Sequence, residues 1–247
     1  MTILVVGASG ATGRLLVDQL LERGEKVRVI VRAADNLSTA ARLNDNLSII
    51  NARLLDLTDA DLARHTRGCS AIASCLGHNL TFKGIFGPPR ALVTDAARRL
   101  CAAAKSNAPD GPVKYVLMCS SGVRNRDLDE PVSFAQKCVI GLIRALLPPH
   151  ADNENAADFL RVTIGQNDPV IGWAAVRPDG LVDEEAVSAY ETHPSPIRSA
   201  IFDSGKVSRI NVAHFMADLI TDDKVWREWK GRMPVIYSRS ESPTAST

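Results

Sequence analysis

The 247-residue chain lacks both a long apolar run and an excess of charge of either sign. The longest apolar candidate, 139–147, is interrupted by Gly141 and Arg144 and ends at Pro148 and Pro149. It falls short of the roughly 18 apolar residues that a transmembrane helix needs. The formal net charge of +1 creates no field that would attract a nucleic acid or an anionic membrane. The sequence therefore predicts no membrane partner and no nucleic-acid partner.

Cysteine is also scarce and follows no recognisable pattern. The cysteines are odd in number, widely spaced and free of any Cys-x-x-Cys pair, which argues against a disulfide framework and against a zinc site. They are Cys69, Cys75, Cys101, Cys119 and Cys138. No basic segment precedes the short apolar run 2–6, so no signal peptide is expected and the fold is expected to begin at residue 1. Reduced thiols in a cytoplasmic protein without a metal site are the simplest interpretation.

The sequence does contain a regular alternation of strand and helix patterns. Buried β-branched and aliphatic runs predict strands at 3–6, 27–31, 47–50, 71–75, 113–119, 171–176 and 235–237. Apolar residues at helical spacing predict helices at 12–23, 59–66, 90–105, 132–147 and 153–163, and a last helix capped by Asn211. Continuous apolar strands indicate a parallel sheet that helices cover on both faces. We expect a single α/β domain over 1–237, with the doubly wound, mainly parallel sheet of the Rossmann fold.

Two segments depart from this alternation. Pro194 and Pro196 break any long element between 179 and 206, so we expect loops and short pieces that cover a ligand site. The Ser/Thr-rich segment 238–247 has too little apolar surface to become ordered, and a disordered tail is expected there.

A glycine-rich segment joins the first predicted strand to the first predicted helix. It reads Gly7-Ala8-Ser9-Gly10-Ala11-Thr12-Gly13. Glycines at this point permit a tight turn, a close approach of the backbone to a pyrophosphate and close packing of the helix, while the helix N-terminus favours the anion. A glycine-rich structural turn is the alternative. The residues expected to contact a dinucleotide are Gly7, Ser9, Gly10, Ala11, Thr12 and Gly13.

The Gly-x-x-Gly-x-x-Gly spacing resembles that of the short-chain dehydrogenase/reductase superfamily, in particular its atypical branch. The segment Gly-Ala-Ser-Gly-Ala-Thr-Gly-Arg is similar to NmrA-like proteins, NAD(P)H-dependent flavin reductases and biliverdin-IX-beta reductase. The resemblance covers about residues 1–220 in the order of elements, but it is specific only in short motifs. It implies the fold and the cofactor more firmly than the substrate.

The end of the second strand indicates which nicotinamide cofactor binds. An acidic residue there bonds the ribose 2′-OH of NAD, whereas a cation accommodates the 2′-phosphate of NADP. Arg32 occupies this place, Ser9 can add a hydroxyl donor, and Arg14 is a second nearby cation. NADP(H) is therefore the expected cofactor, the alternative being that Arg32 is an ordinary solvated residue at a strand end.

Two further motifs resemble segments of the family that contact the adenosine. Asp56-Leu57 is similar to an Asp-hydrophobic pair beside the adenine, although Asp56 could equally cap the following helix. Cys75-Leu76-Gly77 is similar to the segment that passes the adenine ribose. Cys75 is interpreted as a packing residue rather than a reactive thiol, because a buried cysteine behaves as a small hydrophobe.

A third motif, Arg177-Pro178-Asp179-Gly180-Leu181, looks like the family's Arg-Pro-x-x-Leu loop. The resemblance implies that the backbone around Pro178 contacts the carboxamide side of the nicotinamide. Pro178 could instead simply end the preceding strand.

Candidate catalytic residues follow the carboxyl ends of the strands, where ligands of open α/β sheets bind. Ser120 resembles the serine that bonds a substrate carbonyl, with a structural turn hydroxyl as the alternative. The family's Tyr-x-x-x-Lys pair is absent, and comparison of the helices places His150 near the tyrosine and Asn153 near the lysine. Asn153 can hold a ribose but cannot act as an acid. His150 is a candidate proton donor, because the reference pKa of a histidine side chain lies near neutrality; the alternative is that His150 is a surface residue. His78 and Asn79 are further candidates.

These features predict an NADPH-dependent oxidoreductase that acts on a small-molecule acceptor. A flavin-, quinone- or tetrapyrrole-like acceptor can draw its proton from solvent, so loss of the tyrosine need not abolish hydride transfer. The alternatives are a non-catalytic NADP-binding redox sensor of the NmrA-like type, and a dehydratase or isomerase on the same fold. Trp226 and Trp229 could mark the surface of a homodimer or of another protein partner, or could pack on the chain's own core.

Overall fold

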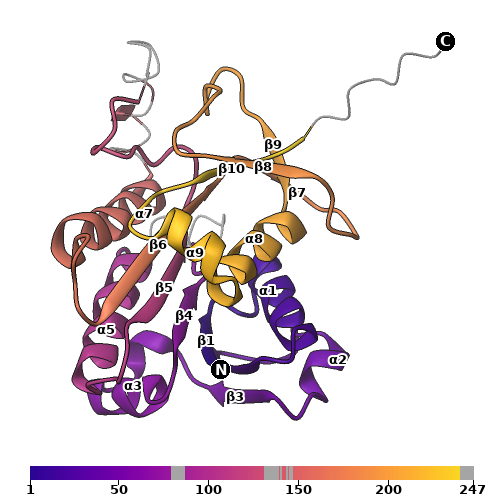
Figure 1. Ribbon diagram of the computed structural model, residues 1–247, viewed down its shortest axis with the longest axis vertical. Coiled ribbons are helices and arrows are strands. Elements are labelled where there is room, and N and C mark those ends of the chain that lie inside the picture. The colour runs from indigo at the N-terminus through magenta and orange to yellow at the C-terminus, as the bar shows by residue number, and fades with distance from the viewer. Residues whose placement is uncertain (79–86, 131–138, 140, 143, 145–146, 240–247) are drawn as a thin grey trace.

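The computed structural model describes residues 1–78, 87–130, 139, 141–142, 144 and 147–239 (Figure 1). In these residues a central sheet has the strand order β3-β2-β1-β4-β5-β6-β10-β8. The strands are β1 (Thr2–Val6), β2 (Lys26–Val31), β3 (Leu47–Asn51), β4 (Ala71–Ser74), β5 (Val113–Met118), β6 (Ile171–Pro178), β8 (Tyr190–His193) and β10 (Val235–Ser238). Each neighbouring pair is parallel except β10 with β8. The doubly wound Rossmann fold expected from the sequence is confirmed.

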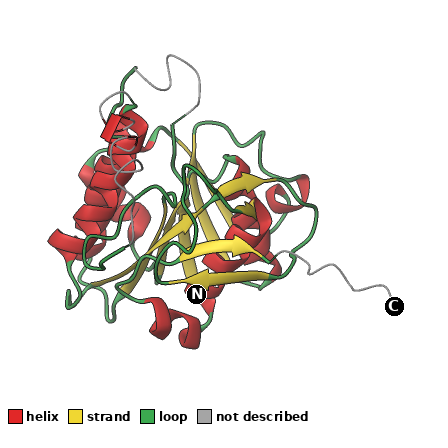
Figure 2. Ribbon diagram, turned by 90° about the horizontal axis from the view of Figure 1, so that it is seen from above, coloured by secondary structure: helices red, strands yellow, loops and turns green. Residues whose placement is uncertain are grey.

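Helices cover both faces of the sheet, and Figure 2 shows the yellow strands with red helices on either side. The α-helices are α1 (Ala11–Glu22), α2 (Thr39–Arg42), α3 (Asp59–Thr66), α5 (Leu92–Ser106), α7 (Pro148–Asp158), α8 (Arg209–Thr221) and α9 (Asp223–Trp229). A 3-10 turn, η1 (Leu54–Asp56), precedes α3, and a π-helical turn, η2 (Phe159–Ile164), extends α7. Helices α1 and α8 pack together on one face, and α3, α5 and α7 adjoin on the other.

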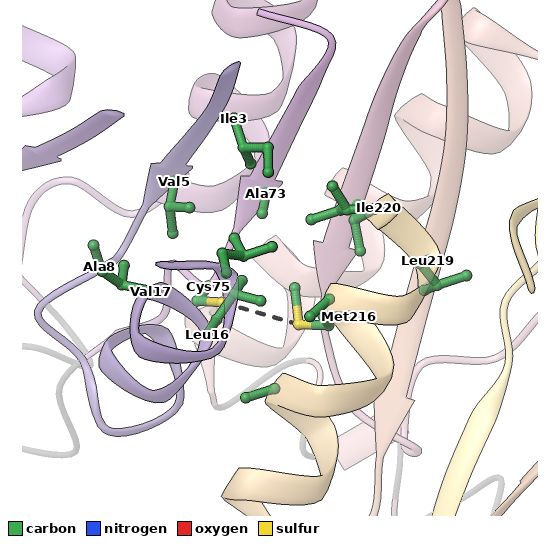
Figure 3. Close-up of a cluster of buried hydrophobic side chains, with 14 of the residues drawn as sticks. Ile3, Val5, Ala8, Leu16, Val17, Ala73, Cys75, Met216, Leu219 and Ile220 are labelled. Atoms are coloured by element: carbon green, nitrogen blue, oxygen red, sulfur yellow. Dashed lines mark hydrogen bonds between the residues drawn. The ribbon is translucent and has the colours of Figure 1, made fainter. Parts of the chain in front are cut away.

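Strand β1 shows how the sequence builds two cores from one sheet. Successive side chains of a strand point to opposite faces. Ile3 and Val5 join the core beneath α1 and α8, whereas Leu4 and Val6 join the core beneath α3 and α5, and all four are fully buried. Figure 3 shows the first of these cores. The β1 strand is thus fixed from both sides, and so is the loop that follows it.

The segment 179–206, named the covering segment for the role expected of it, consists of loops and short strands, in line with the expected loops and short pieces. β7 (Gly180–Val182) pairs in parallel with β9 (Lys206–Ser208), and β8 adds to the edge of the central sheet. At the other end of the chain, β10 extends through Ser238, one residue into the segment expected as a tail, while 240–247 lie outside the described residues.

Three expectations need correction or lie outside the described part. Helix α8 begins at Arg209 with Ser208 as its cap, because the Asn211 side chain is fully buried and bonds Ser188 in the covering segment instead. Helix α7 begins five residues before the expected start, at Pro148, since proline is well tolerated in a first helical turn. The helix expected at 132–147 falls mostly outside the described residues.

The two tryptophans near the end of the chain pack on this chain. Trp229 is 4% exposed in the core beneath α8. Trp226 covers Gly172 on β6, where a methyl group would lie 2.9 Å from its ring. Of the two roles considered for Trp226 and Trp229, the structure shows packing on the chain's own core. In the described part of the chain, no helix has the length and apolar character that crossing a membrane requires.

Candidate dinucleotide-binding site

The glycine loop between β1 and α1 has room for backbone only. Gly7 has φ +74°, and a methyl group on it would lie 2.4 Å from the carbonyl carbon of Cys75. A methyl group on Gly13 would lie 2.1 Å from the Gly7 oxygen, and one on Gly10 would lie 3.2 Å from the same atom. Gly10 precedes α1 and has no side chain to cap the first amides. These amides are therefore available to an anion at the positive end of the helix.

A cleft of about 640 Å³ lies beside this loop. The residues that line it come from the glycine loop and from the carboxyl ends of β2 and β3. They are Ser9, Arg32, Ala33, Asn36, Asn51, Ala52, Arg53 and Asp56. The structure thus brings together Ser9, Arg32 and Asp56, which were expected at the cofactor and lie in three separate segments of the sequence.

Sequence reasoning missed Arg53. A signal was present, because Arg53 follows β3 as Arg32 follows β2, and the carboxyl ends of neighbouring parallel strands meet at one edge of a sheet. Both arginines are exposed, and neither guanidinium forms an ion pair or a hydrogen bond with any other described residue; the Arg53 backbone carbonyl accepts from the Asp56 amide at 3.0 Å. Asn36 was missed as well, since it lies in the irregular segment after β2.

The capping role considered for Asp56 is wrong. Thr58 caps α3 in a reciprocal arrangement, in which the Asp61 amide donates to Thr58 Oγ1 at 3.1 Å and the Thr58 amide donates to Asp61 Oδ2 at 3.2 Å. Asp56 belongs to η1, and its exposed carboxylate lies on the cleft. Leu57 is half-buried against the core beneath α5.

The segment after β4 passes directly behind the glycine loop. Backbone atoms of Cys75 and Leu76 are the ones that a side chain at Gly7 would meet. Cys75 is 7% exposed, its Sγ lies 4.0 Å from Met216 Sδ (Figure 3), and burial raises the pKa of its thiol to about 12. A neutral, packed thiol is a structural group, which agrees with its interpretation as a packing residue. Gly77 is exposed.

Ser120 is held at the end of β5 by its neighbours on both sides. The Cys119 amide donates to the Val176 carbonyl at 2.9 Å, and the Ser121 amide donates to the Pro178 carbonyl at 2.9 Å. Pro178 is the last residue of β6, so it does end the strand, and its carbonyl also fixes the loop that carries Ser120.

The arginine before Pro178 is fully buried. Arg177 Nε donates to the Met233 carbonyl at 2.7 Å, Nη1 to the Val123 carbonyl at 3.0 Å and Nη2 to the Pro194 carbonyl at 3.0 Å. Nη1 also lies 2.8 Å from Glu130 Oε1. One guanidinium thereby joins the loop after β5 to the covering segment.

Asp179 makes a second connection of the same kind. Its Oδ1 accepts from Ser121 Oγ at 3.0 Å, and its Oδ2 accepts from the Gly205 amide at 2.8 Å. Arg177 and Asp179 therefore fix the same two segments from either side of Pro178. Sequence reasoning assigned this motif a backbone contact and could not foresee these side-chain bonds.

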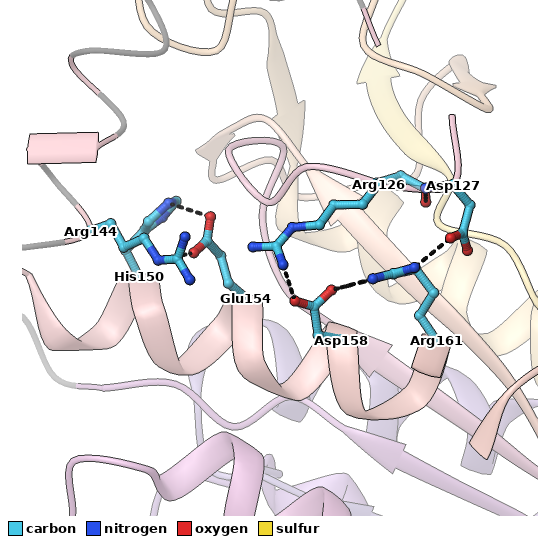
Figure 4. A network of polar contacts seen from close by, with 8 residues as sticks. Arg126, Asp127, Arg144, His150, Glu154, Asp158 and Arg161 are labelled. Atoms are coloured by element: carbon cyan, nitrogen blue, oxygen red, sulfur yellow. Dashed lines mark hydrogen bonds and ion pairs between the residues drawn. The ribbon is translucent and has the colours of Figure 1, made fainter. Parts of the chain in front are cut away.

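His150 lies beside Ser120. A methyl group on Gly122 would lie 3.3 Å from His150 Cε1 and 3.7 Å from Ser120 Oγ, so both side chains border the same glycine. The side chain of His150 is 14% exposed, and its Nε2 lies 3.5 Å from Glu154 Oε1, one helical turn further along α7 (Figure 4). His150, Arg144 and Arg126 hold the pKa of Glu154 below its ordinary value. The structure thus places the side chains of Ser120 and His150 next to the same glycine.

Asn153, the third catalytic candidate, makes a bond within its own helix. Its Nδ2 donates to the Pro149 carbonyl at 3.1 Å. The residue that faces His150 with the i, i+4 spacing of the family's Tyr-x-x-x-Lys pair is Glu154, which sequence reasoning did not single out.

His78 is held by a buried carboxylate. Its Nε2 lies 2.8 Å from Asp152 Oδ2, and the side chains of the two residues are 4% and 1% exposed. Asp152 also accepts from the amides of Val93 and Thr94, at 2.8 Å and 3.0 Å, and therefore caps α5 from another helix. Asn79 lies outside the described residues.

Comparison of the sequence with protein families agrees with the fold and with the glycine loop. The model of the NAD(P)H-binding family matches residues 7–223. The chain belongs to this family of NAD(P)H-binding Rossmann proteins.

Individual relatives are more distant. A segment of 77 residues, 31% of this chain, is 44% identical to dihydroflavonol 4-reductase of Arabidopsis thaliana and spans 19% of that protein. An anaerobillin reductase of Escherichia coli O157:H7 has a similar structure with a TM-score of 0.67 and 18% identity, over 99% of this chain and 100% of that one. A short-chain dehydrogenase/reductase of Veillonella parvula, solved with NADP, gives a TM-score of 0.69 and 11% identity, over 100% and 96% of the two chains. At such low identity, these similarities show a common fold and nothing more specific.

Proposed function

We propose that the protein is an NADPH-dependent reductase that passes a hydride to a flavin-, quinone- or tetrapyrrole-like acceptor. The observation that carries this proposal is the polar cleft beside the glycine loop, in which Ser9 and Arg32 border the uncapped start of α1. NADPH matches such a lining, because its pyrophosphate brings negative charge to the start of α1 and its 2′-phosphate brings negative charge to Ser9 and Arg32.

The chain's residues divide the work of holding the cofactor. The amides at the start of α1 bind the pyrophosphate, and Gly7, Gly10 and Gly13 leave the space that the backbone needs to approach it. Arg32 and Ser9 donate to the 2′-phosphate, and Asp56 accepts from the adenine amine. The bound nicotinamide supplies the hydride.

The acceptor side is built around Ser120 and His150. Ser120 Oγ donates to a carbonyl of the acceptor, and His150, oriented by the buried carboxylate of Glu154, holds a proton beside it. A histidine opposite a carboxylate has a defined orientation. The chain has no Tyr-x-x-x-Lys pair, which favours acceptors that do not depend on a tyrosine acid. One structural neighbour is an anaerobillin reductase, an activity that supports this class of acceptor.

The test is turnover of NADPH, followed by its absorbance, with flavins, quinones and tetrapyrroles as acceptors. We expect multiple turnovers with at least one of these acceptors. His150→Gln is expected to lower kcat, while the affinity for NADPH stays unchanged. His65→Gln, on α3, is the matched control and is expected to behave as wild type.

A non-catalytic NADP-binding sensor is the second candidate, because a missing tyrosine acid costs such a protein nothing. The two candidates differ in one result. If NADPH binds with defined stoichiometry but no acceptor class gives more than a single turnover, the reductase proposal fails and the sensor is favoured. If NADPH does not bind, both fail.

A further inference from the structure

The cleft carries a second cation that the cofactor motif does not account for. We infer that Arg53 and Arg32 together form a clamp of two guanidinium groups for the 2′-phosphate, so that Arg53 is a specificity-determining residue. The inference rests on the proposed function, since it concerns the same cofactor. It adds Arg53, which follows β3, to the side chain at the end of β2 that usually distinguishes NADP from NAD.

The register of the sheet places the two arginines just beyond the ends of neighbouring strands, offset by one residue. Val31 on β2 is paired with Asn51 on β3, and the Ala52 amide donates to the Val31 carbonyl at 2.9 Å. Arg32 is the first residue after β2, and Arg53 is the second after β3. Both contribute to the wall of the same cleft.

The charges on this wall are not balanced by the chain itself. In the described part of the chain, neither the Arg32 nor the Arg53 guanidinium has an ion-pair or hydrogen-bond partner. Asp56 is the one carboxylate among the residues of the cleft wall, and it forms no ion pair with either. Arg99 shows the contrast, because it lies near the same turn but is paired with Asp59 at 2.8 Å. Two uncompensated guanidiniums on one concave surface attract an anion.

The chemistry of a phosphate monoester matches this arrangement. Its charge at neutral pH is about −1.5 to −2, so one guanidinium leaves part of this charge unneutralised and a second guanidinium strengthens binding further. The planar fork of each guanidinium matches two phosphate oxygens, while Asn36 and Ser9 on the same wall can donate to the remaining oxygens. A ribose 2′-OH would leave both cations without a partner. Discrimination against NAD therefore depends on both strand ends.

Calorimetric binding of cofactor fragments tests the clamp without relying on turnover. The probes are 2′,5′-ADP, 3′,5′-ADP and 5′-ADP, and the variants are Arg32→Gln, Arg53→Gln and the double variant. Arg42→Gln is the matched control, because Arg42 is an exposed arginine on α2 outside the cleft wall. Thermal melting of each variant confirms that it is folded.

Each single variant in the cleft is expected to lose roughly ten- to hundredfold in affinity for 2′,5′-ADP. The affinity for 5′-ADP should stay near wild type, and the double variant should no longer separate the two probes. Arg53→Lys should recover part of the loss, since it restores the charge without the fork.

Three results would overturn the inference. If Arg53→Gln keeps the wild-type ratio while Arg32→Gln loses it, Arg53 takes no part in recognition although the cofactor proposal stands. If 3′,5′-ADP binds as tightly as 2′,5′-ADP, the clamp does not read the 2′ position. If the wild type itself does not prefer 2′,5′-ADP to 5′-ADP, the clamp and the NADPH proposal fail together.

Discussion

Gly13 is the position in the glycine loop with the least room for a side chain, and substituting it tests the site. A methyl group at Gly13 would lie 2.1 Å from the Gly7 oxygen, and 2.9 Å and 3.0 Å from further backbone atoms of the loop. Real contacts of this kind are essentially never shorter than 3.0 Å, so the start of α1 and the loop must separate by about 0.9 Å in Gly13→Ala. Backbone atoms cannot swing aside as a flexible side chain can.

The energetic cost follows from two opposing contributions. Overpacking of this kind costs about 1–3 kcal/mol, and replacing a glycine inside a helix by alanine returns up to about 1 kcal/mol. We therefore expect Gly13→Ala to lower the free energy of unfolding by about 1–2 kcal/mol. The hydrogen bonds that we propose from these amides to the pyrophosphate are each worth about 1.5–3 kcal/mol, so displacing the amides should raise the Kd for NADPH at least tenfold.

Two other glycines calibrate the result. At Gly10 the closest atom to a methyl group is 3.2 Å away, so Gly10→Ala should melt almost as wild type, yet it should weaken NADPH binding because the methyl group fills the phosphate approach. At Gly111 no atom lies within 4 Å, and Gly111→Ala should change neither property. Urea unfolding and calorimetric titration measure both quantities. Wild-type NADPH affinity in Gly13→Ala would refute the assigned role of the loop.

Three further predictions concern the groups that support the site. Asp152→Ala should lower the free energy of unfolding by about 3–5 kcal/mol, because it leaves His78 and the first amides of α5 without their acceptor; Asp110→Ala, at an exposed loop position, should leave chemical denaturation unchanged. The depressed pKa of Glu154 should stabilise the fold above its unfolded pKa, near 4.3, and this contribution is lost as the pH falls through the folded value. Wild type and Glu154→Gln should therefore converge in stability at acid pH, and a constant gap across a pH series would contradict this. Cys75 should resist alkylation at pH 8 in the native protein, as peptide mass spectrometry would report, because burial raises its pKa to about 12; rapid native labelling would show that the thiol is accessible.

Local patterns were sufficient for most of the scaffold. The helix expected at 59–66 coincides with α3, whose capping box is encoded within four residues, and the first five strands lie within a residue of their expected bounds because each is a buried aliphatic run. The glycine loop could also be predicted locally, since its three glycines are required by close contacts within the loop and with the adjacent strand end.

Contacts between distant segments could not be read in this way. Helix α5 was expected to begin at residue 90 but begins at Leu92, with no side-chain cap on Ala91, because its capping carboxylate, Asp152, comes from α7. The buried bonds of Arg177 depend on three carbonyls from three segments, and no pattern along the chain reports them. Family spacing suggested Asn153 at the lysine position, whereas side-chain packing decides that Glu154 faces His150.

In the proposed function, the glycine loop and the arginines beside it hold NADPH. Calorimetric titration of the wild-type protein with NADPH and NADH, at one fixed ionic strength, tests it most directly. We expect a single site that binds NADPH at least tenfold more tightly than NADH, and an Arg32→Glu variant in which this difference disappears. Failure of the wild type to bind either nucleotide, or equal affinity for both, would contradict it.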